Sequence, residues 1–203
     1  NVRDLSGNGN NGNLFGSTGT STVPGKMGQA VSFDGTTSYI DVGNKTALQL
    51  GSTGTISIWM KATGSQCSDL YPMAMGNLGF GTDSNGYAFA QWFSCDATFS
   101  LILASGSTLD FLQGGGAFDG KWHLVTGTWD GTTEKIYTDG ALINSQPQTV
   151  TPVTNVNNFV IGRDPITDSV YSFFPGQLDD ARVYNRALSA AEVKVLYDLT
   201  VSK

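Results

Sequence analysis

Short segments in which hydrophobic and polar residues alternate recur along most of the chain. In the segment TISIWMKA, Ile56, Ile58 and Met60 fall on one side and Trp59 on the other. The segments AVSFDGTTSYIDV and KWHLVTGTWDG alternate in the same way. A period of two is typical of a β-strand that buries one of its faces. The pattern therefore predicts a chain built mainly of β-strands.

Turn signals separate many of these segments. Asp34, Asp130 and Asp139 each follow a hydrophobic segment and precede a glycine. The Asp-Gly dipeptide tolerates the positive φ angles of a hairpin turn. Many short strands separated by such turns predict an antiparallel sandwich or barrel. A length of 203 residues is ordinary for one all-β sandwich, so we expect a single domain over residues 1–203.

A strong helix signal lies near the end of the chain, in the segment ALSAAEVKVLYDL. Ser189 and Glu192 stand three positions apart and form a capping box. Leu188 and Val193 occupy the two positions of a hydrophobic staple. The segment predicts one short amphipathic helix that docks on the sandwich.

The charge and composition of the chain exclude some classes of partner. The formal net charge is −6 and the isoelectric point is near 4.5, so nucleic acid and anionic membrane surfaces would be repelled. The sequence has no apolar run of about 18 residues, so we expect no insertion into a membrane. Charged residues make up only 14% of the chain, and Gly, Ser, Thr and Asn are abundant. This composition favours an extracellular or cell-surface location.

Two cysteines, Cys67 and Cys95, are the only ones in the chain. They have no third cysteine or nearby histidine that would complete a zinc-binding pattern. In an oxidising compartment we expect them to form a disulfide. Two unpaired buried thiols are the alternative.

Several segments, taken in order, resemble one family. DLSGNGNNG, GKMGQAVSFDGTTSYIDV, TISIWMKA, KWHLVTGTWDG, YTDGALI and GQLDDARVYNRALSAAEVKVLYD are similar to the laminin-G-like or concanavalin A-like lectin/glucanase jelly roll of bacterial surface proteins, of the adhesin or modular minor pilin type. The resemblance implies an all-β, antiparallel two-sheet β-sandwich with one short C-terminal helix. Family members usually begin with a strand before DLSGNGN, so the resemblance implies that this first strand is missing, has been trimmed or belongs to a preceding module.

The residues argue against catalysis, although this superfamily includes glucanases. Retaining glycosidases need two carboxyl groups about 5 to 5.5 Å apart. The chain has only two glutamates, Glu134 in a hairpin and Glu192 in the capping box. The single histidine, His123, has no G-x-S-x-G nucleophile elbow to serve, and we interpret it as a packed or partly exposed strand residue. We therefore expect a protein that is not an enzyme.

A sugar site needs an aromatic platform beside amide or carboxylate groups, because sugars present apolar C–H faces and many hydroxyls. The segment between the cysteines supplies this mixture, and the candidate glycan-binding residues are Asp83, Asn85, Tyr87, Gln91 and Trp92. The alternative is that Trp92 is an ordinary core residue. The segment VYSFFPG offers a second candidate rim, with Tyr171, Phe173 and Phe174.

The opening segment DLSGNGNNGN has three interpretations. It is a linker, a multiple turn, or a loop that binds a structural calcium ion. The resemblance disfavours a linker, because the segment lies inside the family pattern. Calcium takes six to eight oxygen ligands, many of them carbonyls. On the calcium hypothesis Asp4 and Asn11 are ligands and Asp180, an acid that the family pattern keeps near the last strand, completes the set.

These observations predict a non-catalytic extracellular recognition module, with glycan binding for adhesion as the leading function. The expected partners are host or environmental glycans, including glycoproteins, and the module is expected to belong to a larger surface protein or filament. A protein-interaction or spacer module without a sugar site is the alternative. A glycoside hydrolase, or a module associated with one, is the minor alternative.

Overall fold

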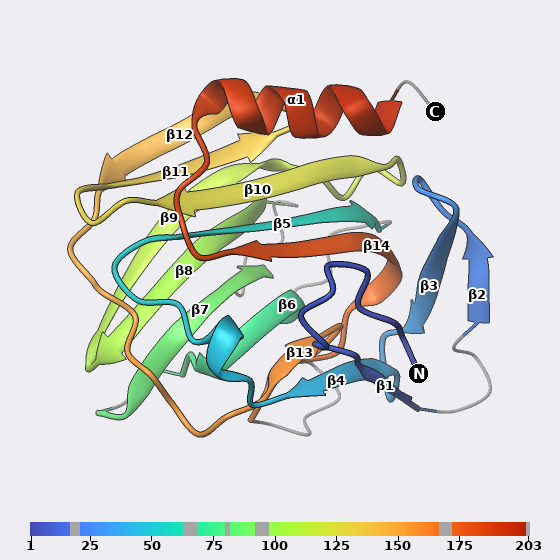
Figure 1. The fold of residues 1–203 in the computed structure, drawn as a ribbon, viewed down its shortest axis with the longest axis horizontal. Helices are drawn as coiled ribbons and strands as arrows, with labels where there is room; N and C mark the ends of the chain where they lie inside the picture. Colours follow the sequence, from blue (N-terminus) through green and yellow to red (C-terminus); the bar gives the residue numbers. More distant parts are fainter. Residues whose placement is uncertain (17–20, 63–68, 80–81, 92–97, 167–171, 202–203) are drawn as a thin grey trace.

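The protein is a sandwich of two antiparallel β-sheets with an α-helix on one outer face (Figure 1). This computed structural model describes residues 1–16, 21–62, 69–79, 82–91, 98–166 and 172–201. The predicted fold class is therefore confirmed. The predicted disulfide between Cys67 and Cys95 lies outside the described residues.

Among the described residues each sheet has seven strands, and neighbours in the sheet are often far apart in sequence. The first sheet contains, in spatial order, β1 (Asn13–Phe15), β4 (Tyr39–Gly43), β13 (Phe159–Ile161), β6 (Leu70–Asn77), β7 (Ser84–Gln91), β8 (Thr98–Gly106) and β9 (Thr108–Gly116). The second sheet contains β12 (Ala141–Pro147), β11 (Thr133–Thr138), β10 (His123–Trp129), β5 (Gly54–Lys61), β14 (Pro175–Tyr184), β3 (Gln29–Asp34) and β2 (Ser21–Pro24). A short 3₁₀-helix, η1 (Thr46–Leu48), follows β4.

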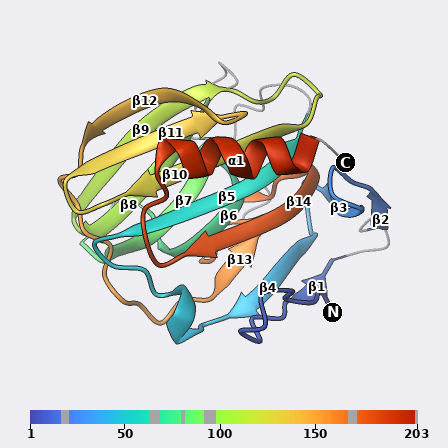
Figure 2. The same cartoon turned by 45° about the horizontal axis from the view of Figure 1, so that its top comes forward.

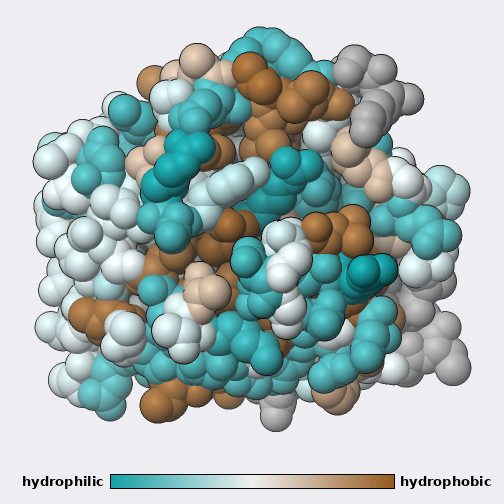
Figure 3. All heavy atoms as spheres, in the orientation of Figure 1, coloured by the Kyte–Doolittle hydropathy of each residue, from teal (hydrophilic) through white to brown (hydrophobic). Residues whose placement is uncertain are grey.

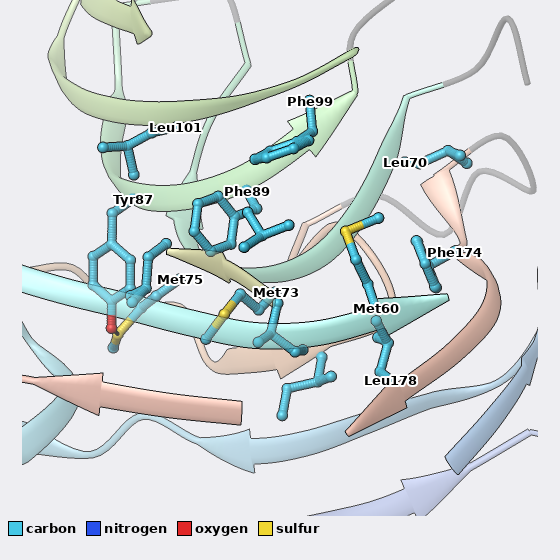
Figure 4. Close-up of a cluster of buried hydrophobic side chains, with 14 of the residues drawn as sticks. Met60, Leu70, Met73, Met75, Tyr87, Phe89, Phe99, Leu101, Phe174 and Leu178 are labelled. Atoms are coloured by element: carbon cyan, nitrogen blue, oxygen red, sulfur yellow. Dashed lines mark hydrogen bonds between the residues drawn. The ribbon is translucent and has the colours of Figure 1, made fainter. Parts of the chain in front are cut away.

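The main core fills the space between the two sheets. Strand β5 shows how the sequence builds it, because Ile56, Ile58 and Met60 are buried in this core while Trp59 faces the opposite side. The predicted alternation of β5 is therefore confirmed. Figure 4 shows part of the core, where side chains of β5, β6, β7 and β8 meet. Burial of this kind contributes roughly 1.5 to 3 kcal/mol for each large apolar side chain.

Helix α1 (Ala190–Val201) covers part of the outer face of the second sheet (Figure 2). Val193 and Leu196 pack there against Trp59 and Leu124. The rings of Trp59 and Tyr197 stack with their centroids 5.8 Å apart. The helix thus buries the large side chains that β5 and β10 turn away from the main core.

The start of α1 has the predicted cap. The backbone N–H and the hydroxyl of Ser189 donate to the Glu192 carboxylate at 2.8 and 2.9 Å, and the Glu192 N–H donates to Ser189 Oγ at 3.3 Å. Leu188 and Val193 are both buried in the same cluster, as a hydrophobic staple requires. Both local predictions for this helix are confirmed. Within the described residues, no helix is long and apolar enough to cross a lipid bilayer.

Two valines on α1 test how much its docking contributes to stability. Val193 is 0% exposed and Val195 is 54% exposed, so the same substitution removes buried methyl groups at one position only. We expect Val193→Ala to lower the free energy of unfolding by about 2 kcal/mol, from lost transfer energy and a cavity. Val195→Ala should change it by less than about 0.5 kcal/mol. Urea unfolding of both variants measures this, and equal effects would contradict the docked position of the helix.

Candidate functional site

Tyr87, one of the two aromatic residues of the predicted glycan site, lies in the core of the protein. Its side chain is 1% exposed, and its hydroxyl donates to the Leu48 carbonyl at 2.7 Å. Its ring lies 5.6 Å from that of Trp129, and Figure 4 shows it among the buried side chains of β6 and β7. Burial also raises the pKa of Tyr87. A ligand at the surface cannot contact this ring, so Tyr87 is a core residue and not a platform.

The other predicted glycan-binding residues are not brought together around a platform. Gln91, at the end of β7, is buried. Asp83 is exposed and Asn85 is half-buried at the start of the same strand. The Asn85 amide donates to the Asp83 carbonyl at 2.8 Å and accepts the Asn77 N–H at 3.0 Å, so it shapes the turn before β7. Trp92 lies outside the described residues.

An aromatic cluster instead lies on the outer face of the first sheet, near its β1 edge. Phe15 and Tyr39 are register partners on β1 and β4, and their neighbours Leu14 and Ile40 point toward the core. The alternation of a strand therefore turns Phe15 and Tyr39 outward. Their rings stack at 5.0 Å with 13° between the planes, and Phe15 is 43% exposed.

Arg163 and Phe173 complete the cluster from a different part of the chain. The two residues form an isolated antiparallel bridge between the end of β13 and the start of β14. The Arg163 guanidinium carbon lies 4.0 Å from the centre of the Tyr39 ring, within the range of a cation–π contact. Phe173 is buried behind them, 6.3 Å from Tyr39. We call Phe15, Tyr39, Arg163 and Phe173 the aromatic surface.

The second predicted rim, in VYSFFPG, takes part in this surface through one residue. Phe173 is a backing residue of the aromatic surface, whereas Phe174 is 0% exposed and belongs to the main core. Tyr171 lies outside the described residues. Of these three residues, only Phe173 therefore contributes to a described surface feature, and it does so from beneath.

A polar row lies beside the aromatic pair. Asn13 lies two positions before Phe15 on β1, and its register partner Asp41 lies two positions after Tyr39 on β4, so both share the outer face with the aromatic pair. Same-face neighbours along a strand are roughly 6.5 to 7 Å apart. Asp41 accepts the side-chain amide of Asn158 at 2.9 Å, which holds its carboxylate in place. The outer face thus combines exposed aromatic area with amide and carboxylate groups.

No clear signal in the sequence points to the aromatic surface. Strand β1 has three residues, too few to show a period of two. Tyr39 lies in a strand that the alternating pattern does identify, but its partner Phe15 belongs to another segment.

The loop that precedes β1 is organised by the carboxylate of Asp4. This carboxylate accepts the N–H and hydroxyl of Ser6 at 2.8 and 2.9 Å and the N–H of Asn10 at 2.9 Å. The Asp4 N–H in turn donates to the Asn11 side-chain oxygen at 2.9 Å. These hydrogen bonds, with the Ser6 hydroxyl first, lower the pKa of Asp4. The predicted pair Asp4 and Asn11 is therefore brought together by a hydrogen bond.

Asp180, the third predicted calcium ligand, forms an ion pair. Both of its carboxylate oxygens accept Arg182 Nε, at 3.0 and 2.9 Å, and the guanidinium terminus lies 2.8 Å away. A calcium ion would have to share the Asp180 carboxylate with Arg182, whose positive charge repels a bound cation. Among the described residues, no group of three or more acidic, His or Cys side chains converges. Calcium binding stays a prediction.

His123 is enclosed by two carboxylates. Its Nδ1 lies 2.9 Å from Asp139 and its Nε2 lies 3.0 Å from Asp119, and the side chain is 18% exposed. Burial by itself would lower the pKa of His123, but the hydrogen bonds to Asp139 and Asp119 outweigh it and raise the pKa. Since both ring nitrogens are occupied, His123 joins the start of β10 to the hairpin before β12. It is the partly exposed strand residue that the sequence predicted.

The family follows from a comparison over most of the chain. Residues 34–194 match the model of the Concanavalin A-like lectin/glucanases superfamily. The chain belongs to this superfamily. The resemblance to the laminin-G-like and concanavalin A-like domains is thereby confirmed. No curated protein sequence matches this member of the superfamily.

Solved structures of the same fold include bacterial binding modules. Domain 4 of AbnA, an extracellular GH43 arabinanase of Geobacillus stearothermophilus, solved with arabinotriose, has a TM-score of 0.75 and 21% identity over 97% of this chain and 93% of that domain. The CBM40 of a Ruminococcus gnavus sialidase, bound to sialyllactose, has a TM-score of 0.63 and 18% identity, with coverages of 87% and 96%.

A third similar structure is larger. The binding domain of Paraclostridial Mosquitocidal Protein 1 has a TM-score of 0.73 and 19% identity over 98% of this chain. This chain spans 49% of the length of that binding domain. At these identities the likeness shows a shared fold.

The opening loop can be tested with and without metal. We expect Asp4→Ala to lower the melting temperature even in a chelator, because three hydrogen bonds within the loop are lost. Asp4→Asn keeps an acceptor oxygen and should lower it less. The calcium hypothesis adds that calcium stabilises the wild type by about 2.7 kcal/mol at a hundredfold excess over its dissociation constant, and that Asp180→Ala removes this gain.

Scanning calorimetry in calcium and in chelator, with elemental analysis of the purified protein, decides between these interpretations. Equal melting temperatures for the wild type in both solutions, without bound metal, would leave DLSGNGNNGN as a hydrogen-bonded turn.

Proposed function

We propose that this chain is a non-catalytic, extracellular glycan-binding module that serves adhesion, and that its ligand lies on the aromatic surface. The observation that carries the proposal is the stacked pair of Phe15 and Tyr39, of which Phe15 is 43% exposed. A flat apolar ring at the surface matches the C–H face of a sugar.

The polar row supports the same ligand class. Asn13 presents an amide and Asp41 a fixed carboxylate on the face that carries the aromatic pair. Pockets for small ligands combine apolar contact area with a few well-placed polar groups. A sugar ring stacked on Phe15 would have its hydroxyl groups within reach of such a row.

The similar structures support recognition of carbohydrate. Two of them were solved with oligosaccharides, arabinotriose and sialyllactose, and one of these belongs to an extracellular enzyme. Because the fold alone does not fix function, this support concerns the class of ligand and not its identity. The proposal includes host or environmental glycans as the ligands of this chain. It also includes that the chain is part of a larger surface protein.

The positions of the two glutamates support a non-catalytic module. Glu134 is 0% exposed, and Glu192 is held in the capping box of α1 by Ser189 and Arg186. Neither glutamate lies on the aromatic surface. A glycosidase would need a pair of carboxyl groups on the two sides of a bound glycosidic bond.

A protein-interaction module is the second candidate, and one observation favours it. Val195 and Leu199 on α1 are more than half exposed, and Leu142 on β12 is 51% exposed. Figure 3 shows hydrophobic side chains gathered over α1. Binding of a protein ligand through α1 would be independent of the aromatic surface.

Substitution of Phe15 tests the site. We expect Phe15→Ala to weaken binding to the best ligand on a glycan array at least about fivefold, since stacking on one ring contributes roughly 1 kcal/mol. Val156→Ala is the matched control, because Val156 is an apolar side chain that is 91% exposed on another loop. It should leave binding unchanged.

Affinity for one site should be weak, in the micromolar to millimolar range that corresponds to about −8 to −4 kcal/mol. Display of many copies on a surface would raise the avidity. Glycan binding that survives Phe15→Ala in a folded protein would place the site elsewhere. The absence of any bound glycan, together with a protein ligand sensitive to Val195→Asp, would favour the second candidate.

A further inference from the structure

The two sheets meet at the side of the sandwich formed by β9, β11 and β12. Strand β9 is the last strand of the first sheet, and β12 is the edge of the second. The side-chain amide of Asn144 on β12 donates to the Gln113 carbonyl on β9 at 3.1 Å, which ties the two edges together. At this side of the sandwich Asp110 of β9 and Glu134 of β11 each carry a carboxyl group, and both side chains are buried.

Asp110 has the environment of an anion. Its carboxylate accepts the backbone N–H groups of Thr149 and Val150, each at 2.7 Å, and the hydroxyl of Thr149. Burial alone would raise the pKa of Asp110, but the hydrogen bonds from Glu134, Thr149 and Val150 outweigh it and lower the pKa. Charged acceptors that receive several backbone N–H groups keep their charge even when buried.

Glu134 has the environment of a neutral acid. Its side chain is 0% exposed, and Gln146 Nε2 donates to Oε2 at 3.3 Å. The other oxygen, Oε1, is buried and receives no hydrogen bond from the described part of the protein. An oxygen that carries a proton needs no donor, and this proton can be given to Asp110. Burial first, and then the Asp110 carboxylate, raise the pKa of Glu134 to about 9.

The groups that face this pair supply no positive charge. The β12 neighbour of Glu134 is the neutral Gln146, and its β10 neighbour is Trp129. Lys135 is the next residue on β11, so its side chain points to the opposite face of the sheet. Among the ion pairs formed between described residues, none includes Asp110 or Glu134. The shared proton is therefore the means by which two buried acids can lie together.

We propose that Asp110 and Glu134 form a proton-dependent clasp between the two sheets, closed while Glu134 is protonated and weakened when Glu134 ionises. Ionisation would place two negative charges beside each other inside the sandwich, with no cation to offset them. Thr149 and Val150 would then hold one carboxylate while the other has lost the hydrogen bond that it donated.

The stability of the fold should fall as the pH rises, because the pKa of Glu134 is raised in the folded protein. The pKa of Glu134 in the folded protein lies above the ordinary value of 4.5. The clasp therefore contributes its full stability below about pH 4.5, and the contribution is lost as the pH rises toward about 9. Between these limits the folded protein holds one proton that the unfolded chain releases. The free energy of unfolding is therefore higher in mildly acidic solution than in alkaline solution.

The clasp is separate from the aromatic surface. It lies at the β9 end of the first sheet, whereas the aromatic surface lies at the β1 end. The proposal does not depend on which ligand the module binds, and its test needs none.

The test compares the wild type with Glu134→Gln in urea unfolding at pH 5, 7 and 9. The amide of Gln can donate to Asp110 at every pH, so the variant lacks the titration but keeps a donor. We expect the unfolding equilibrium constant of the wild type, divided by that of Glu134→Gln, to rise with pH by up to about tenfold per unit. A constant ratio from pH 5 to pH 9 would overturn the proposal.

Glu192→Gln is the matched control, because it changes the only other glutamate. Hydrogen bonds and ion pairing with Arg186 first, and then Ser189, lower the pKa of Glu192 to about 2, so its contribution to stability changes only in acid. The ratio of wild type to Glu192→Gln should therefore be constant between pH 5 and pH 9.

A second measurement uses the wild type alone and holds even if Glu134→Gln fails to fold. Because the chain has two glutamates, a sample labelled with ¹³C at the glutamate carboxyl gives two signals. We expect one signal to titrate in acid and the other to keep the shift of a protonated acid at pH 7 and to titrate near pH 9. Two signals that both titrate below pH 5.5 would show that Glu134 is ionised at neutral pH and would refute the clasp.

Discussion

The central strands of this protein bury one of their two sides against the opposite sheet, and the positions of the remaining side chains depend on that choice. The inward side of β5 carries Ile56, Ile58 and Met60, so Trp59 lies on the outer face of the sheet, where another element must bury it. Helix α1 buries Trp59 by packing Val193 and Leu196 against it on this outer face. The same alternation sends Tyr87 inward and Phe15 outward, and so decides which aromatic residues can meet a ligand.

The first sheet separates two kinds of chemistry. At its β1 end, Phe15, Tyr39 and Arg163 present aromatic and cationic groups on an outer face. At its β9 end, Asp110 meets Glu134 of the second sheet in the interior. The proposed binding surface and the buried carboxyl pair therefore lie at opposite ends of the first sheet.

Membership of the Concanavalin A-like lectin/glucanases superfamily explains the β-sandwich framework. It does not identify a ligand, which would depend on the residues at the surface. The similar solved structures share between 18% and 21% of their residues with this chain, yet they reproduce its fold over most of its length. A sandwich needs hydrophobic residues of about the right size at inward positions, and many sequences meet that requirement. Outward residues on the strands are less constrained, which is why modules of one fold can present different binding surfaces.

The sequence alone determined the features that arise within a few neighbouring residues. The period of two identified the strand of Ile56, Ile58 and Met60, and the capping box identified the start of α1, because both depend on residues less than one turn or one hairpin apart. Only the tertiary structure decided that Tyr87 is core, that Phe15 stacks on Tyr39 beside Arg163, and that Glu134 meets Asp110. These contacts join separate strands or opposite sheets, and which strands become neighbours, and in which register, depends on the packing of the whole sandwich.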